Sequence, residues 1–170
     1  RDPVTMKIIA RDVPPRTAWS LEQAGVHPLL ARLFAARGVR SAEELDDNAS
    51  KLLPPQTLRG TQEAAVLLAD AIAQGQRICI VADYDCDGAT ACATGLRGLR
   101  MLGARPDQLS YVVPDRALHG YGLTPPIVEL VKAQQADVLV TVDNGMASHE
   151  AVTRARALGM RVIITDHHLP

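Results

Sequence analysis

Four short apolar runs in the second half of the chain determine the expected fold. They cover residues 78–82, 109–113, 138–142 and 162–165 and are rich in Ile and Val. Each run is too short for a helix, and its apolar residues are largely continuous, which is typical of parallel strands covered on both faces. Stretches with helical periodicity lie between them. The pattern is βαβαβαβ, so we expect an α/β fold with an open, mostly parallel sheet flanked by helices.

Helix boundaries support the same order. A helix is expected over residues 62–74, where apolar side chains recur at helical spacing and a glycine follows. Thr124 and Pro125 form a suitable N-cap and first-turn pair for the helix between the second and third strands. Gly103 and Gly159 lie where two other helices should end. One helix is therefore predicted ahead of each strand.

The residues before the first of these helices predict a separate, helical or extended N-terminal lead. It contains one apolar helical face, formed by Leu29, Leu30, Leu33 and Phe34. Two consecutive prolines, Pro54 and Pro55, then form a stiff break. We therefore place a lead over residues 1–55 and the main domain over residues 56–170.

Composition narrows the class of protein. A chain of 170 residues with 47% hydrophobic content can bury the core of one domain. Its apolar runs fall far short of the roughly 20 residues that span a bilayer, and Arg1 to Pro3 do not begin a signal segment. We therefore expect a cytoplasmic protein with no membrane partner. The net charge of −1 neither indicates nor excludes a DNA partner. Cys79, Cys86 and Cys92 lack zinc-site spacing and are expected to be reduced and mostly buried.

Polar side chains suited to a metal or a phosphate follow every predicted strand. In chain order, these are Asp83, Asp85 and Asp87; Asp115, Arg116 and His119; Asp143, Asn144 and Gly145; and Asp166, His167 and His168. The carboxyl ends of parallel strands open onto one edge of the sheet, where ligands bind, so we expect the four groups to converge.

The residue types at this edge predict a metal-dependent hydrolase. Three carboxylates at alternate positions, Asp83 to Asp87, repel one another unless cations or protons lie between them. Oxygen donors with one or two imidazoles suit manganese or magnesium better than a structural zinc. Two such ions can activate a water and stabilise the leaving oxygen of a phosphoester. We therefore expect two-metal phosphoester hydrolysis.

Each motif by itself also has a simpler interpretation. An Asp-x-Asp after a strand often caps a helix, the Asp-Asn-Gly at residues 143–145 could form an ordinary turn, and His167 with His168 could be a surface pair. An EF-hand loop starting at Asp83 would need Glu at its twelfth position, where the chain has Thr94. The coincidence of such groups at four strand ends favours a functional site.

Together these motifs resemble the DHH phosphoesterases. The resemblance rests on Asp-x-Asp-x-Asp-Gly at residues 83–88, Asp-Asn-Gly at 143–145 and Asp-His-His at 166–168. The stretches 82–90, 114–123 and 27–32 make the chain most similar to the family's exonucleases that degrade single-stranded DNA in the 5′→3′ direction. Other branches usually place a histidine before their Asp-x-Asp, which this chain lacks.

The resemblance implies an activity and a role for each site residue. Residues 56–170 would be a DHH catalytic domain that hydrolyses phosphodiester bonds of single-stranded DNA in repair and recombination, with two Mn²⁺ or Mg²⁺ ions. The implied metal ligands are Asp85, Asp87, Asp143 as the bridge, and His167. The implied catalytic residues are Asp83, which supports the acidic cluster, Asp166, which orients the histidines, and His168, which contacts the scissile phosphate. The implied substrate-binding residues are Arg116, His119, Gly120, Tyr121, Gly122, Asn144 and Gly145.

The resemblance also implies partners and further parts. Single-stranded DNA is the implied substrate, with a single-strand-binding protein and a helicase as protein partners. Family members continue beyond the position of Pro170 with another metal-binding Asp, a DHH-associated domain and an OB-type domain. We therefore expect the catalytic domain to be incomplete at its C-terminal end, and the chain as given to fold but to be nearly inactive. Two alternatives stay open: a phosphodiesterase for short oligonucleotides or cyclic dinucleotides, and a non-catalytic module that binds DNA or protein.

Overall fold

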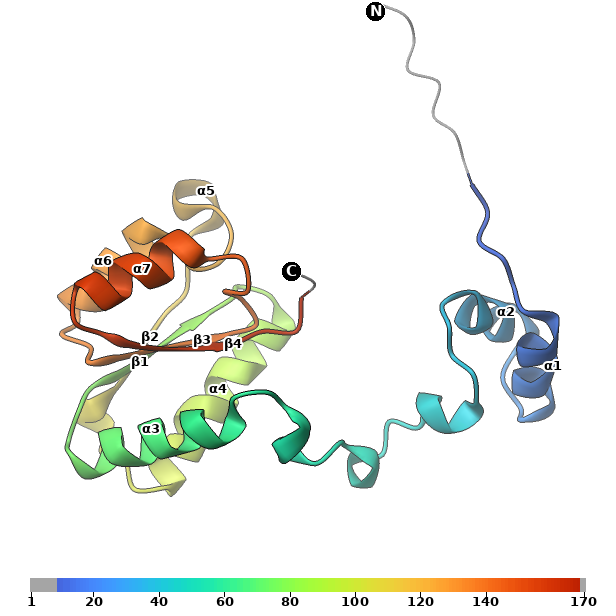
Figure 1. Ribbon diagram of the computed structural model, residues 1–170, viewed down its shortest axis with the longest axis horizontal. Helices are drawn as coiled ribbons and strands as arrows, with labels where there is room; N and C mark the ends of the chain where they lie inside the picture. The colour runs from blue at the N-terminus through green and yellow to red at the C-terminus, as the bar shows by residue number, and fades with distance from the viewer. Residues whose placement is uncertain (1–8, 169–170) are drawn as a thin grey trace, which may run out of the picture. The chain divides into compact units, whose positions relative to one another are not determined.

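The computed structural model describes residues 9–168, which form a helical unit up to Thr57 and an α/β unit from Leu58 onwards (Figure 1). The sequence expectation that rests on Arg1 to Pro3 lies outside the described residues. None of the helices within residues 9–168 combines the length and the apolarity that crossing a bilayer requires.

The helical unit is built around two short helices, α1 (Pro15–Gln23) and α2 (Pro28–Ala36), each of which begins with proline. Three 3₁₀ turns follow, η1 (Ala42–Leu45), η2 (Ala49–Lys51) and η3 (Pro55–Thr57). The helices pack through Leu21 of α1 and Ala31 and Ala35 of α2, which are almost completely buried. Small side chains at this contact let the two backbones approach each other closely.

The buried face of α2 differs from the apolar face predicted for it. Leu29, Leu30 and Leu33 are 61%, 45% and 48% exposed, whereas Phe34 packs against the core. The helix is apolar on nearly all sides, so helical spacing alone does not identify the side that faces α1.

The α/β unit contains one sheet of four parallel strands in the order β2-β1-β3-β4. The strands are β1 (Ile78–Ala82), β2 (Leu109–Val112), β3 (Val138–Val142) and β4 (Arg161–Thr165). This arrangement confirms the predicted α/β fold. Because β1 and β3 occupy the centre, they are nearly fully buried, which explains their continuous apolar sequences.

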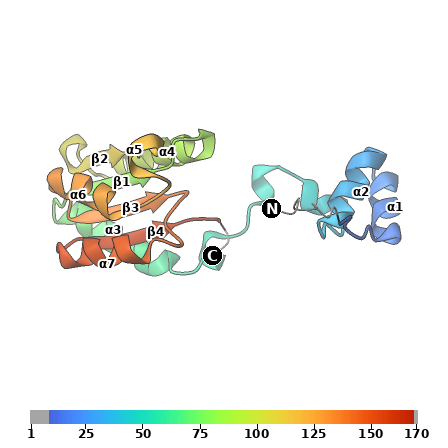
Figure 2. The same cartoon turned by 90° about the horizontal axis from the view of Figure 1, so that it is seen from above.

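Helices cover both faces of this sheet (Figures 1 and 2). One face carries α3 (Thr61–Ala73) and α4 (Cys86–Met101), and the other carries α6 (Pro125–Ala133) and α7 (His149–Ala157). Two short elements complete the unit, η4 (Pro106–Gln108) before β2 and α5 (Arg116–His119) after it.

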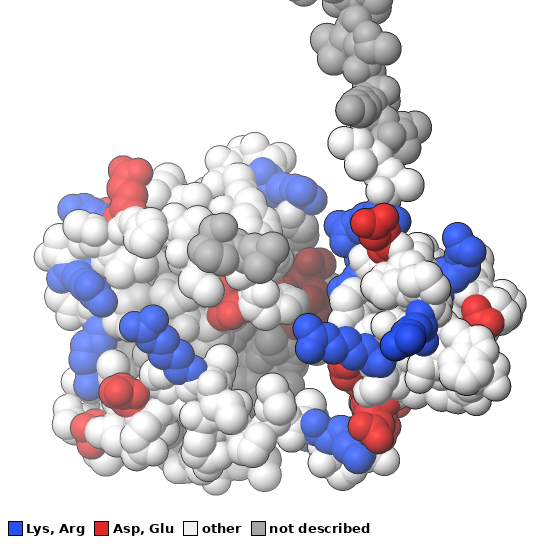
Figure 3. All heavy atoms as spheres, turned by 45° about the vertical axis from the view of Figure 1, so that its right-hand side comes forward, with Lys and Arg blue, Asp and Glu red and all other residues white. Residues whose placement is uncertain are grey.

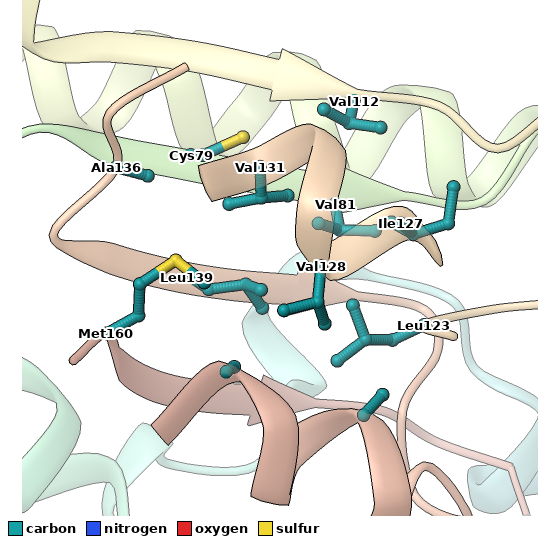
Figure 4. Packing of buried hydrophobic residues seen from close by; sticks show 12 residues of the cluster. Cys79, Val81, Val112, Leu123, Ile127, Val128, Val131, Ala136, Leu139 and Met160 are labelled. Carbon is teal, nitrogen blue, oxygen red and sulfur yellow. The ribbon is translucent and has the colours of Figure 1, made fainter. Parts of the chain in front are cut away.

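Alternate residues of β1 supply two separate cores. Cys79 and Val81 join the core on the α6 side, whereas Ile78, Ile80 and Ala82 join the core on the α3 side. Figure 4 shows the first of these cores, in which side chains of α6 lie against β1 and β3. Both faces of the strand are therefore dry, and its carboxyl end is held firmly at the sheet edge.

The cysteines differ in their surroundings. Cys79 and Cys92 are buried as expected, and burial raises the pKa of the Cys79 thiol to about 11. Cys86 is exposed, because it begins α4 at the rim of the acidic loop. All three are free thiols.

We expect Leu139→Ala to lower the free energy of unfolding by about 2–5 kcal/mol, because it opens a cavity in the core between the sheet and α6. Leu139 has no exposed surface, whereas Leu130 on α6 is 44% exposed. Leu130→Ala is therefore the matched control and should cost much less. Urea denaturation followed by circular dichroism compares the two variants, and equal losses would contradict the assigned core.

Candidate metal centre

The ends of β1, β3 and β4 bring acidic and imidazole side chains together at one edge of the sheet. One cluster contains Asp83, Asp85 and Asp143, and another contains Asp143, His167 and His168. Within each cluster, one possible ligand atom per residue lies within 4.8 Å of the others. Asp143 belongs to both clusters, so it stands between the acidic loop after β1 and the histidines after β4.

The backbone of Asp143 adopts a conformation that is uncommon for a residue with a side chain. Its φ is +64°, in the left-handed region, where aspartate is tolerated better than most residues. The Asp143 N–H donates a 3.0 Å hydrogen bond to the Thr165 carbonyl of β4. The turn that places this carboxylate is thus fixed to the neighbouring strand, a pattern often found where a side chain must be aimed.

The Asp143 carboxylate is buried, and the protein offers it few contacts that would replace its lost hydration. The residue is 9% exposed, and neither carboxylate oxygen accepts a well-directed hydrogen bond from residues 9–168. His167 Nε2 nevertheless approaches Asp143 Oδ1 to 2.8 Å, and it lies 3.7 Å from Asp87 Oδ2. These oxygen and nitrogen atoms lie close together, yet no well-directed hydrogen bond joins them. This is the arrangement expected of ligands that share a cation. The donor set therefore fits a hard divalent metal.

The pKa of Asp143 is consistent with this interpretation. Burial raises it above the usual range for aspartate, and the charges of Asp87 and Asp85 raise it further, while His167 acts in the opposite direction. A divalent cation would remove the repulsion among these carboxylates and keep Asp143 ionised.

The acidic loop after β1 also forms the start of α4. Asp85 is the N-cap of the helix and accepts a 3.2 Å hydrogen bond from Gly88 N–H through Oδ1. Asp83 is 2% exposed, and its Oδ1 accepts a 2.8 Å bond from Tyr84 N–H. A Cβ added at Gly88 would lie 2.8 Å from the Asp83 carbonyl oxygen. Asp85 therefore caps α4, as the simpler interpretation predicted, and it also belongs to a cluster of potential metal ligands.

Asp166 holds His168 in a defined orientation. Asp166 Oδ1 lies 2.8 Å from His168 Nδ1 and also accepts a 3.1 Å bond from His168 N–H, while Oδ2 accepts a 2.8 Å bond from Met146 N–H. Burial alone would raise the pKa of Asp166, but these hydrogen bonds outweigh it, and the pKa is lowered. The bond to Asp166 raises the pKa of His168. His168 is thus biased towards its protonated form.

Tyr121 lies against this pair. Its hydroxyl is 3.3 Å from His168 Nε2 and 3.4 Å from the Asp143 carbonyl oxygen, to which it donates. Burial, followed by the charge of Asp83, raises the pKa of Tyr121 to about 12. The phenol therefore stays neutral and can donate a hydrogen bond at the boundary between the histidines and the end of β3.

Asn144 has a different environment from the substrate contact expected of it. Its side chain has no exposed surface, and Nδ2 donates to the carbonyls of Val81, at 3.2 Å, and Val142, at 2.9 Å. These bonds join the end of β1 to the end of β3 directly beside Asp143. Gly145, which is also buried, completes the turn with a φ of +113°.

The residues after β2 form the rim and join neither cluster. The Arg116 guanidinium lies 5.0 Å from the centre of the Tyr84 ring, within the range of a cation–π contact. His119 Nδ1 accepts a 3.2 Å bond from Asp115 N–H, and Asp115 caps α5 through Ala117 N–H. Gly120 and Gly122 have positive φ values of 74° and 70°, which fit the turn that carries Tyr121.

Sequence reasoning assigned no role to Tyr84 or Met146. Tyr84 supports Arg116, and the Met146 backbone anchors Asp166. The position of Tyr84 between two acids was the available signal, whereas a backbone donor such as Met146 has no sequence signal.

On the face of the α/β unit visible in Figure 3, basic and acidic side chains are interspersed.

Comparison with known proteins identifies related chains. The family described as "DHH family, N-terminal domain" matches residues 77–170. The single-stranded-DNA-specific exonuclease RecJ of Salmonella typhimurium is 50% identical over 147 residues, which are 86% of this chain and 25% of that protein. The chain thus spans about a quarter of the length of the curated relatives it matches.

Solved structures agree with the sequence comparison. A crystal structure of exonuclease RecJ bound to manganese matches with a TM-score of 0.60 and 41% identity, covering 69% of this chain and 29% of that one. The crystal structure of RecJ from Thermus thermophilus in complex with Mn²⁺ gives a TM-score of 0.59 and 36% identity, covering 92% of this chain and 22% of that one. Both of these related structures contain manganese.

We expect Asn144→Asp to lower the free energy of unfolding by about 3 kcal/mol, because a carboxylate would face two carbonyl oxygens in a buried position. Asn144→Ala leaves those carbonyls without a donor and should cost about 1–3 kcal/mol. Asn48 is an exposed N-cap whose Oδ1 accepts from Ser50 N–H, so Asn48→Asp keeps its bond and serves as the control. Urea denaturation measures all three, and stability unchanged by Asn144→Asp would refute the assigned contacts.

As the pH is lowered, we expect Mn²⁺ binding to weaken. The loss should begin at a higher pH than it would if Asp143 had the pKa of an exposed aspartate. A metal ligand must be deprotonated, and the raised pKa of Asp143 means that this carboxyl takes up its proton earlier as the pH decreases. Titrations of Mn²⁺ followed by electron paramagnetic resonance between about pH 7 and pH 4 would measure this. Asp143→Asn should weaken binding and flatten the pH dependence. An unchanged profile in that variant would exclude Asp143 as the titrating ligand.

Proposed function

The chain belongs to the DHH family, as its motifs predicted, and we propose that it carries the metal-binding part of a single-stranded-DNA-specific exonuclease. The observation that carries the proposal is the buried, uncompensated Asp143 carboxylate between the acidic loop and the histidines. Such an arrangement suits phosphodiester hydrolysis assisted by two divalent ions. We assign residues 56–170 to the catalytic domain and the 5′→3′ direction to the reaction.

We propose Asp85, Asp87, Asp143 and His167 as the ligands of Mn²⁺ or Mg²⁺. Asp143 is the proposed bridge, because it belongs to both clusters of potential ligands. When bound, the ions would supply an activated water and stabilise charge on the leaving oxygen. Asp83 is the buried member of the acidic cluster and has one oxygen held by Tyr84 N–H, so its proposed task is to support the ligands electrostatically and to fix the loop.

His168 is proposed to contact the scissile phosphate. Its raised pKa favours the imidazolium, which can donate a charge-assisted hydrogen bond to a phosphate oxygen. Asp166 accepts from Nδ1 and from the His168 backbone, so it orients the ring before substrate arrives. The Tyr121 hydroxyl lies 3.3 Å from Nε2 and 3.4 Å from Nδ1, so it also contacts this ring.

The rim is proposed to position the DNA strand. Arg116 supplies a cation beside Tyr84, an arrangement that can bind a phosphate and stack a base. His119 and the turn from Gly120 to Gly122 are proposed to shape this entrance. Gly145 lets the chain turn closely beneath the site, whereas Asn144 is assigned to holding the strand ends rather than to touching DNA.

The cellular setting follows from the same proposal. We infer a cytoplasmic enzyme of DNA repair and recombination, in keeping with the DNA substrate. By family resemblance, a single-strand-binding protein and a helicase are its proposed partners, since they would cover and expose the single strands on which it acts.

We expect the full-length protein to degrade 5′-labelled single strands from the labelled end in the presence of Mn²⁺ or Mg²⁺, and to leave blunt duplexes largely intact. Asp143→Ala should abolish hydrolysis while the circular dichroism spectrum stays unchanged, because the side chain is a ligand and not part of either core. Gel analysis of 5′-labelled and 3′-labelled strands gives both the rate and the direction.

Three results would count against the proposal. Digestion from 3′ ends would overturn the assigned direction. Preferred cleavage of dinucleotides or cyclic dinucleotides would indicate the phosphodiesterase alternative. Activity retained by Asp143→Ala would show that this carboxylate is not the bridge.

A further inference from the structure

Two chain segments that carry proposed metal ligands are joined by hydrogen bonds at the point where each leaves the sheet. The first follows β3 and contains Asp143, and the second follows β4 and contains His167. Asp143 N–H donates to the Thr165 carbonyl, and Met146 N–H donates to Asp166 Oδ2. A small number of bonds between the two segments therefore sets how far apart their ligands lie.

Thr165 adds another such bond through its side chain. Its hydroxyl donates a 2.5 Å hydrogen bond to the Thr141 carbonyl of β3. Because Thr165 pairs with Val142 in the sheet, its hydroxyl and its carbonyl contact β3 on both sides of Val142, at Thr141 and at Asp143. Thr165 thus connects the last pair of residues in the β3–β4 pairing to the backbone of the proposed bridging residue.

The hydroxyl bond is additional to the pairing of the strands. Thr165 is the last residue of β4, and it pairs with β3 in the same register as the four residues before it. Threonine and valine have nearly the same shape and both favour strands, so strand formation does not require a hydroxyl here. The bond acts where the pairing ends and the ligands begin, and there it opposes separation of the two strand ends.

We propose that Thr165 is a positioning residue for the metal centre, an inference that rests on the function proposed above. Its hydroxyl holds the end of β4 against β3 and so keeps His167 Nε2 within 2.8 Å of Asp143 Oδ1. The left-handed backbone of Asp143 also needs neighbours that hold it in place. Thr165 belongs to neither cluster of potential ligands, so it acts on metal and substrate through Asp143 and His167.

The test uses the full-length protein with Thr165→Val, which keeps the shape of the side chain and removes the hydroxyl. Since one such bond corresponds to about a fivefold change in an equilibrium, the Kd for Mn²⁺ should rise about three- to tenfold. The kcat on single-stranded DNA should fall about tenfold, because small displacements of reacting groups are costly, and KM should change by less than about twofold.

Thr153→Val is the matched control for loss of a hydroxyl bond. Thr153 Oγ1 donates a 2.9 Å bond to the His149 carbonyl of α7, on an exposed face and outside both ligand clusters. This variant should keep the parental kcat, KM and Kd for Mn²⁺.

Thr165→Ser and Thr165→Ala provide a second comparison that does not depend on how valine packs. The serine variant keeps the hydroxyl and should restore parental kcat and Kd to within about twofold, whereas the alanine variant should behave like Thr165→Val. Equal losses in the serine and alanine variants would overturn the inference, because the hydroxyl would then not be the cause.

The unfolding midpoint separates positioning from a purely structural role. If Thr165 only stabilised the sheet, Thr165→Val and Thr165→Ala would lower the midpoint and would keep parental kcat and Kd at temperatures well below it. That result would overturn the inference. Raised Kd and lowered kcat under conditions where circular dichroism shows a fully folded protein would support it.

The Mn²⁺ titration, followed by electron paramagnetic resonance, needs no turnover and so separates this inference from the function on which it rests. A parental protein that binds Mn²⁺ but does not hydrolyse single-stranded DNA would overturn the proposed function, while the Kd of Thr165→Val would still test the positioning role. An active parent with parental kcat and Kd in Thr165→Val would overturn the positioning role alone.

Discussion

The carboxylate of Asp143 creates the electrostatic constraint on which the site depends. Burial raises its pKa, the charges of Asp87 and Asp85 raise it further, and the imidazoles of His167 and His168 approach Oδ1 to 2.8 Å and 3.9 Å. A cation between these groups would satisfy all of them at once, whereas without one the cluster weakens the fold. The surrounding structure keeps this carboxylate buried and aimed at the sheet edge.

The sheet supplies the rigidity that this arrangement requires. Asp143 lies at the end of a central strand with dry faces, its N–H is bonded to β4, and the neighbouring Asn144 is bonded to β1 and β3. At a loosely held position, a residue with a left-handed backbone conformation would relax to a more favourable one. Here hydrogen bonds to three strands hold the conformation in place. The carboxylate can therefore be positioned before a metal binds, and rigid elements carry the site while loops shape its entrance.

The edge of the sheet separates two chemical environments. Acidic and imidazole groups that suit a metal and a phosphate gather after the ends of β1, β3 and β4, and a cavity lies beside them towards α6 and α7. His168 stands between the two environments, oriented by Asp166 and contacted by Tyr121.

Sequence alone determined the strand order along the chain, the α/β class, the family, and the gathering of polar groups at strand ends. These properties depend on local periodicity and on short motifs, which can be read directly from the order of residues in the chain. The tertiary structure decided which side of α2 is buried, that Cys86 is exposed, that Asn144 joins strands, and that a cavity lies beside His168. Such features arise from contacts between residues far apart in the chain, such as Asn144 with Val81, and residue type does not encode which distant backbone group a side chain will meet. Burial of Asp143 has the same origin, because only packing of three strands around it removes its carboxylate from water.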